Sequence, residues 1–201
     1  MTYVRTVPDN EASGRVRELY DRELTGQGYV SNYTRLFSLR PEVYDAWGVL
    51  KNAIRGNLDP RRYELVTVAA AAAIRCTYCM VAHGAILRSD YYSADEVAAI
   101  ARDFRSAGLS AADVAIMAFA EKVALEAYKI TEEDVAGLRR HGLSDEEVFD
   151  VSLAAAARCF FSKTIDAMGA EADEAYGEIG RPLLDVLSVG RPFPLPRTGT
   201  Q

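Results

Sequence analysis

Apolar residues recur along most of the chain at the spacing of an amphipathic helix. Between residues 11 and 24 they stand at positions 16, 19, 20 and 24, which share one helix face. No segment combines strict apolar–polar alternation with enrichment in β-branched residues, and no hairpin dipeptide separates two such segments. The pattern therefore predicts an all-α fold, a compact domain built from many helices.

Cap and turn residues divide this pattern into separate helices. Asp59 is a predicted N-cap, and Pro60 follows it in the first turn, where proline is tolerated. Ser93 and Glu96 have the spacing of a capping box. The predicted helices span residues 11–24, 33–39, 41–55, 61 onward, 93–104, 110–128, 131–140 and 144–168. We expect one helical domain over residues 1–190, with a motif core at 58–90, and an extended or disordered Pro/Gly-rich tail over 191–201.

Two alanine-rich segments resemble each other. VTVAAAAAIRC spans residues 66–76 and VSLAAAARC spans residues 151–159, and both end in Arg-Cys. Because alanine is often buried and lets neighbours pack closely, we expect both segments in the middle of a helical core. The likeness fits an internal duplication of a helical hairpin, and it fits equally well the general similarity of alanine-rich helices.

The composition narrows the class of protein. Of 201 residues, 49% are hydrophobic and 26% are charged, as in soluble globular proteins. The net charge of −6 argues against nucleic-acid binding. The longest uncharged apolar segment, residues 65–74, is about half of what a membrane-spanning helix needs. Since the N-terminus also lacks signal-peptide features, we expect a cytoplasmic protein with no nucleic-acid or membrane partner.

The candidate chemistry lies in CTYCMVAH, residues 76–83, which holds two of the three cysteines and one of the two histidines. On a helix, Cys79 and His83 are neighbours, and Cys76 precedes Cys79 by one turn. C-x-x-C pairs and helix N-termini lower the pKa of a thiol, and a histidine at this spacing can accept its proton. In a cytosolic chain this cluster indicates redox chemistry or metal binding rather than a structural disulfide.

An acidic residue, Glu64, precedes Cys76 by twelve positions. On one straight helix it would lie roughly 22 Å from Cys79 and could take no part in the chemistry. If the helix breaks near Ile74 and Arg75 and the chain folds back, Glu64 can approach His83. The residues alone leave both arrangements open.

The spacing E-x11-C-x2-C-x3-H resembles the motif of the alkylhydroperoxidase D family, within the carboxymuconolactone decarboxylase-like superfamily. The flanking segments LDPRRYELVTVA, RPEVYDAWGVL and LAAAARCFFSKTIDAMGAEAD resemble its peroxidase-related branch, so the likeness covers residues 30–175. The resemblance implies an all-helical, homo-oligomeric protein without metal or other cofactor. It also implies that the cysteine pair begins a new helix after a break.

The resemblance further implies the site roles. Cys79 would be the peroxidatic thiol that attacks a hydroperoxide, and Cys76 would resolve the sulfenic acid to a disulfide. His83 and Glu64 would form a proton relay, and an external dithiol would reduce the disulfide. The chain departs from the family at Tyr78, where some members carry histidine, and at Ile74-Arg75, where many have a glycine or polar break. We expect Arg75 to be able to help hold a thiolate.

Four other interpretations of the motif remain. A zinc site would need Cys159 as its fourth ligand, and buried cysteines can also be inert core residues. A lactone decarboxylase of the same superfamily would not depend on the cysteine pair. A non-catalytic thiol redox sensor or exchange protein would use the same residues as a peroxidase.

Overall fold

The computed structural model describes residues 2–194 and confirms the predicted all-α class, since that range contains helices and no strand. The helices are α1 (Gly14–Gln27), α2 (Asn32–Phe37), α3 (Pro41–Arg55), α4 (Pro60–Ala73), α5 (Thr77–Asp90), α6 (Ala94–Asp103), α7 (Ala111–Glu126), η1 (Ala127–Lys129), α8 (Glu132–Arg140), α9 (Asp145–Ala167), η2 (Glu174–Ile179) and α10 (Arg181–Leu187). Here η marks 3-10 helices.

The helix starts follow the predicted caps. The Asp59 carboxylate accepts a hydrogen bond from the backbone N–H of Arg62, and Ser93 and Glu96 form a capping box. The first helix lies three residues later than predicted, at 14–27. Ser13 has an extended backbone and precedes the helix, and the helix ends at Gly28 with a positive φ of 83°.

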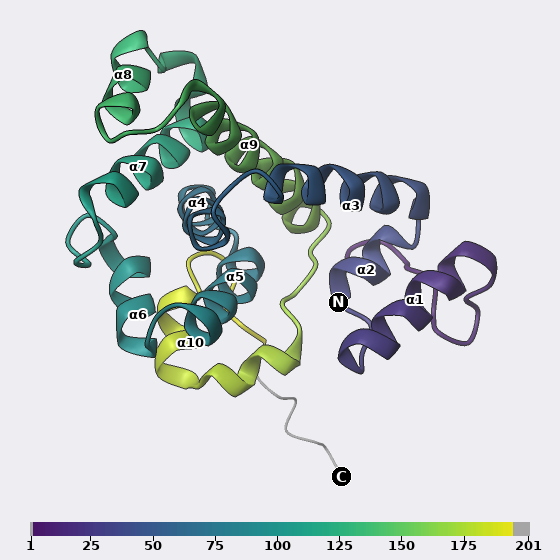
Figure 1. Cartoon of the computed structure of the whole chain (residues 1–201). Coiled ribbons are helices and arrows are strands. Elements are labelled where there is room, and N and C mark those ends of the chain that lie inside the picture. Colours follow the sequence, from purple (N-terminus) through teal and green to yellow (C-terminus); the bar gives the residue numbers. More distant parts are fainter. Residues whose placement is uncertain (1, 195–201) are drawn as a thin grey trace.

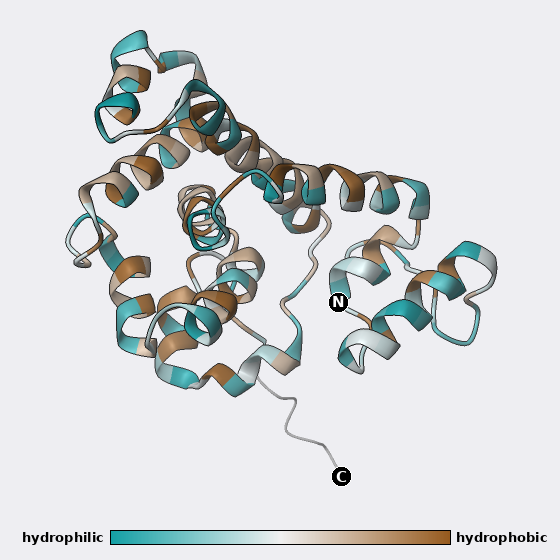
Figure 2. Cartoon of the chain, in the orientation of Figure 1, coloured by the Kyte–Doolittle hydropathy of each residue, from teal (hydrophilic) through white to brown (hydrophobic). Residues whose placement is uncertain are grey.

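Helix α4 runs through the middle of the molecule, with α5, α7 and α9 packed against it (Figure 1). Its residues are buried without interruption from Tyr63 to Ala71. The alanines leave room for these neighbours, and brown, hydrophobic positions accordingly recur along α4, α7 and α9 in Figure 2. Both alanine-rich segments are thus central, as expected, because α4 and α9 contact each other directly.

The sequence pattern did not predict α10. This seven-residue helix buries Leu183, Leu184 and Leu187 and packs on α5 and α6. It is too short to show a helical repeat, so its leucines did not distinguish it from a loop. Leu187 lies so close to Gly84 of α5 that a Cβ there would come within 2.7 Å of it.

The described part of the predicted tail, residues 191–194, contains no helix, and residues 195–201 lie outside the described range. No helix within residues 2–194 has the length and apolar character required to cross a bilayer.

Candidate functional site

The helix breaks where the resemblance implied, between α4 and α5. The backbone N–H groups of Arg75 and Cys76 donate to the carbonyls of Ala72 and Ala71 at 3.0 and 2.9 Å, which is the bonding pattern of a Schellman motif. Arg75 therefore occupies the left-handed position, with φ of 58°, where glycine is usual. The C-terminal segment packs on this turn, since a Cβ on Gly190 would lie 1.9 Å from the Arg75 carbonyl oxygen.

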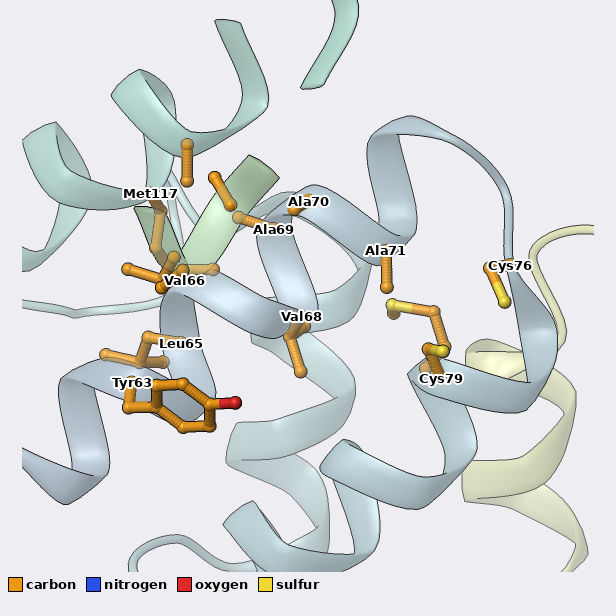
Figure 3. Packing of buried hydrophobic residues seen from close by; sticks show 14 of the residues in the cluster. Tyr63, Leu65, Val66, Val68, Ala69, Ala70, Ala71, Cys76, Cys79 and Met117 are labelled. Atoms are coloured by element: carbon orange, nitrogen blue, oxygen red, sulfur yellow. The ribbon is translucent and has the colours of Figure 1, made fainter. Parts of the chain in front are cut away.

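The break places the cysteine pair at the start of a helix. Cys76 is the N-cap of α5, and Cys79 lies in its first turn. The positive end of the helix dipole favours an anion there. Figure 3 shows both cysteines at this helix start, beside Ala71 of α4. Both side chains are buried.

The same break brings Glu64 to His83. The Nδ1 atom of His83 lies 2.5 Å from Oε2 of Glu64, whose side chain is only 1% exposed. Since a carboxylate can only accept, Nδ1 carries the proton and Nε2 is free to accept one. Burial lowers the pKa of His83, and the charge of Arg158 adds to this against the opposite effect of Glu64. The imidazole is therefore neutral near pH 7.

The Cys79 sulfur receives two hydrogen bonds from α9. The Ser162 hydroxyl donates to Sγ at 3.0 Å, and Nη1 of Arg158 donates at 3.5 Å. The two donors are four residues apart, so they lie on one face of α9. Arg158 is 4% exposed, and its Nε has no hydrogen-bond partner among residues 2–194. A buried guanidinium beside a thiol favours the thiolate.

The two thiols have opposite acidities. Burial opposes ionisation of Cys79, but hydrogen bonding from Cys76, the charge of Arg158 and the Ser162 hydroxyl lower its pKa to about 6. The bond to Cys79, together with burial, raises the pKa of Cys76 far above its ordinary value. At neutral pH the pair therefore holds one thiolate and one thiol, which share a proton between neighbouring sulfurs.

A pocket of about 450 Å³ opens onto Cys79, His83, Glu64 and Arg158. Helix α3 contributes two cations to its lining, Lys51 and Arg55. Aromatic side chains make up much of its wall, namely Tyr33, Tyr44, Trp47, Tyr63, Tyr78, Phe161 and Tyr176.

Tyr78 holds the position that is histidine in some members of the family it resembles. Its hydroxyl donates to the Asp173 carboxylate and accepts from the backbone N–H of Tyr33 at 3.4 Å. The second Asp173 oxygen accepts from the backbone N–H of Asn32 at 2.7 Å. Burial raises the pKa of Asp173 and of Tyr78. Tyr78 therefore links α5 to the segment before η2 and forms part of the pocket wall.

The expectation for Arg75 was wrong. Its Nε donates to the Val189 carbonyl at 3.1 Å, and its side chain lies on the surface. Arg158 contacts the Cys79 sulfur instead. One feature of the sequence could have indicated this role of Arg158: an arginine and a serine stand four positions apart, at helical spacing, in an otherwise apolar segment. Cys159 is a free, partly exposed cysteine, and the described residues include no His/Cys/Asp/Glu cluster suited to a metal ion.

Comparison with known proteins finds one family model that matches part of the chain. The family model described as "Carboxymuconolactone decarboxylase family" matches residues 41–122. No functionally curated protein matches the sequence.

Several solved structures share the fold. An uncharacterized peroxidase-related protein with an alkylhydroperoxidase AhpD core from Ralstonia eutropha JMP134 superposes with a TM-score of 0.79 at 25% identity, covering 87% of this chain and 94% of that one. A peroxidase-related protein from Silicibacter sp. TM1040 gives 0.74 at 21% identity, covering 87% and 90%.

A third structure has another activity. The debrominase Bmp8, solved as a cysteine-to-alanine variant with 2,3,4-tribromopyrrole, gives a TM-score of 0.72 at 17% identity, covering 90% of this chain and 96% of that one. The family model matches less than half of the chain, so the chain is similar to the carboxymuconolactone decarboxylase family over residues 41–122, and it has the alkylhydroperoxidase D-like fold of the peroxidase-related structures.

Proposed function

We propose that the protein is a thiol-dependent peroxidase in which Cys79 reduces hydroperoxides and Cys76 regenerates it. The observation that carries the proposal is the contact of the Cys79 sulfur with the Arg158 guanidinium, the Ser162 hydroxyl and a second thiol, which together lower the Cys79 pKa. A thiolate is the nucleophilic form of cysteine, and this one faces a pocket rather than closed core. An inert core cysteine needs none of these partners.

In the first step the Cys79 thiolate attacks the terminal oxygen of a hydroperoxide. A sulfur–oxygen bond forms, the O–O bond breaks, and the alcohol leaves as an alkoxide that needs a proton. Cys79 is already ionised at neutral pH, so Nε2 of the neutral His83 passes a proton from solvent to this alkoxide, while Glu64 stabilises the transient imidazolium through Nδ1. The unpaired Nε of Arg158 offers a donor for the developing oxyanion.

In the second step the Cys76 sulfur attacks the Cys79 sulfenic acid. A disulfide forms, and the sulfenic hydroxyl leaves with the Cys76 proton as water. An external dithiol then reduces the disulfide by exchange and completes the cycle. The nature of this reductant, the cytoplasmic location and the homo-oligomeric state stay predictions.

Bmp8 supports a second candidate, reductive dehalogenation of an aromatic compound. The aromatic pocket wall fits a flat ring, and the same thiol pair could supply two electrons as it closes to a disulfide. Incubation with 2,3,4-tribromopyrrole and measurement of released bromide tests this candidate directly. The lactone decarboxylase alternative gains nothing from the cysteine environment, because that reaction requires neither thiol.

The test is thiol counting by mass spectrometry before and after one equivalent of cumene hydroperoxide, followed by turnover with dithiothreitol. We expect a Cys76–Cys79 disulfide and continued turnover. Cys79→Ser should lower kcat/KM at least about a thousandfold, because the nucleophile is lost. Cys159→Ser is the matched control and should retain activity. Full turnover in Cys79→Ser contradicts the proposal, and one oxidation without turnover indicates a sensor.

A further inference from the structure

We propose that the pocket selects aromatic hydroperoxides that carry an acidic group, with Lys51 and Arg55 holding the acid. This inference rests on the proposed function for the reaction, while the acid-binding site itself stands on the pocket lining. It names a substrate class that the cysteine chemistry alone does not require.

The size and wall of the pocket indicate a flat organic molecule. Its volume of about 450 Å³ lies within the range of sites for small organic ligands and far exceeds the needs of hydrogen peroxide. The rings of Trp47 and Phe161 stack at a centroid distance of 5.1 Å, and Tyr33 packs against Tyr78 at 5.5 Å. Such ring faces and edges offer stacking contacts to an aromatic substrate.

The charges in the lining favour an anion. Lys51 and Arg55 are four residues apart on α3 and both line the pocket. Lys51 is partly buried and forms no ion pair or hydrogen bond within the described part of the chain. Burial lowers the pKa of Lys51, and repulsion from Arg158 and Arg55 lowers it further. A carboxylate placed beside Lys51 would relieve both effects, because an opposite charge favours the ammonium form.

The carboxylates in the pocket do not contact Lys51, although the charge of Glu64 partly offsets the lowering of the Lys51 pKa. Glu64 is bonded to His83 and lies 3.9 Å from Arg55. Asp90 stands at the last residue of α5 and forms no ion pair with either α3 cation. Lys51 therefore lines the pocket with no contacting carboxylate among the described residues, and an acidic ligand could supply one. The α3 cations and Cys79 line the same pocket. An aromatic substrate could therefore place its acidic group beside Lys51 and Arg55 and its peroxide group beside Cys79.

A binding measurement tests the acid site without any turnover. Trp47 is the only tryptophan of the protein and lies in the pocket wall, so its fluorescence reports on bound ligand. We expect para-isopropylbenzoate to bind at least about tenfold more tightly than the neutral, similarly shaped para-isopropylbenzamide. Lys51→Met should remove most of this preference, and Lys163→Met, which changes an exposed lysine of α9, should keep it. Equal binding of acid and amide by the unmodified protein overturns the inference.

A kinetic measurement connects the acid site to catalysis. The ratio of kcat/KM for para-carboxycumene hydroperoxide to that for its methyl ester should exceed about ten, and Lys51→Met should lower that ratio about tenfold. A ratio near one, with both peroxides turned over, would reject the selectivity and leave the peroxidase proposal intact. Tight benzoate binding without turnover of either peroxide would reject the peroxidase and leave the acid site supported.

Discussion

The dipeptide Arg-Cys closes both alanine-rich segments, but its two copies face in opposite directions. At Arg75-Cys76 the arginine lies on the surface, bonded to the Val189 carbonyl, and the cysteine is fully buried in the site. At Arg158-Cys159 the arginine is buried against the Cys79 sulfur, and the cysteine is partly exposed. One copy supplies the thiol of the site and the other supplies its cation.

The difference arises from where each helix ends. Helix α4 stops at Ala73, so Arg75 sits in a left-handed turn that points its side chain outward. Helix α9 continues to Ala167, so Arg158 lies within a regular helix. It is on the same buried face of that helix as Ala154, Ala155 and Ser162. A local sequence likeness therefore does not carry a residue's role from one segment to another, because helix length and phase decide which side chain faces the core.

The largest effect is expected when each of the two arginines is replaced by methionine in a separate variant. Arg158→Met removes the buried cation, so the pKa of Cys79 should rise from about 6 toward its ordinary value, by 1–3 units for a lost charge partner. Alkylation of Cys79 by iodoacetamide at pH 7 should then slow by about 2- to 90-fold, in proportion to the lost thiolate fraction. Arg75→Met should change it less than about twofold.

The pH profile identifies the cause. In the unmodified protein the Cys79 alkylation rate should rise with pH to a plateau above about pH 7, because the group with the lowered pKa is already ionised there. In Arg158→Met the midpoint should move to higher pH and the plateau rate should be recovered. Arg158→Lys keeps the charge and controls for folding. An unchanged midpoint in Arg158→Met would mean that the guanidinium does not set the thiol acidity.

Much of the fold could be predicted because the signals are local. The cap residues Asp59 and Ser93 act within one helical turn, and the helical apolar spacing needs no knowledge of neighbours. The likeness to the family motif also indicated which four side chains to look for, and the structure brings Glu64 to His83 and Cys76 to Cys79. Their catalytic roles stay a proposal.

The rest depended on packing between distant segments. The helix break had no glycine to mark it, because Arg75 occupies the left-handed position. Arg158 lies 79 positions from Cys79, and only the packing of α9 on the motif brings them together. A lone arginine in an alanine-rich helix is a usable signal in retrospect, since an unpaired buried charge would be costly.

A smaller effect should come from the hydroxyl that accompanies Arg158. Ser162→Ala removes the 3.0 Å hydrogen bond to the Cys79 sulfur but keeps the charge, so alkylation at pH 6 should slow about three- to fivefold. Ser152→Ala is the matched control, because this serine of the same helix bonds to the Val148 carbonyl. Equal effects of the two substitutions would assign the loss to general helix packing rather than to the thiolate.

The smallest effect is expected at Arg75, in the left-handed turn between α4 and α5. Arg75→Gly places the residue usual for a left-handed position at φ of 58° and should raise the free energy of unfolding by about 0.5–1 kcal/mol. That value is the steric relief of about 1–2 kcal/mol, reduced by the greater freedom of glycine in the unfolded chain. Arg75→Ala removes the same side chain and its bond to Val189 while keeping the Cβ, so it should not stabilise the protein.

Urea unfolding of the unmodified protein and the two variants, followed by circular dichroism, separates the effect of backbone strain from that of the lost side chain. If Arg75→Gly were no more stable than Arg75→Ala, the turn would carry no strain, and the surface direction of Arg75 would have to be explained by its contact with Val189 alone.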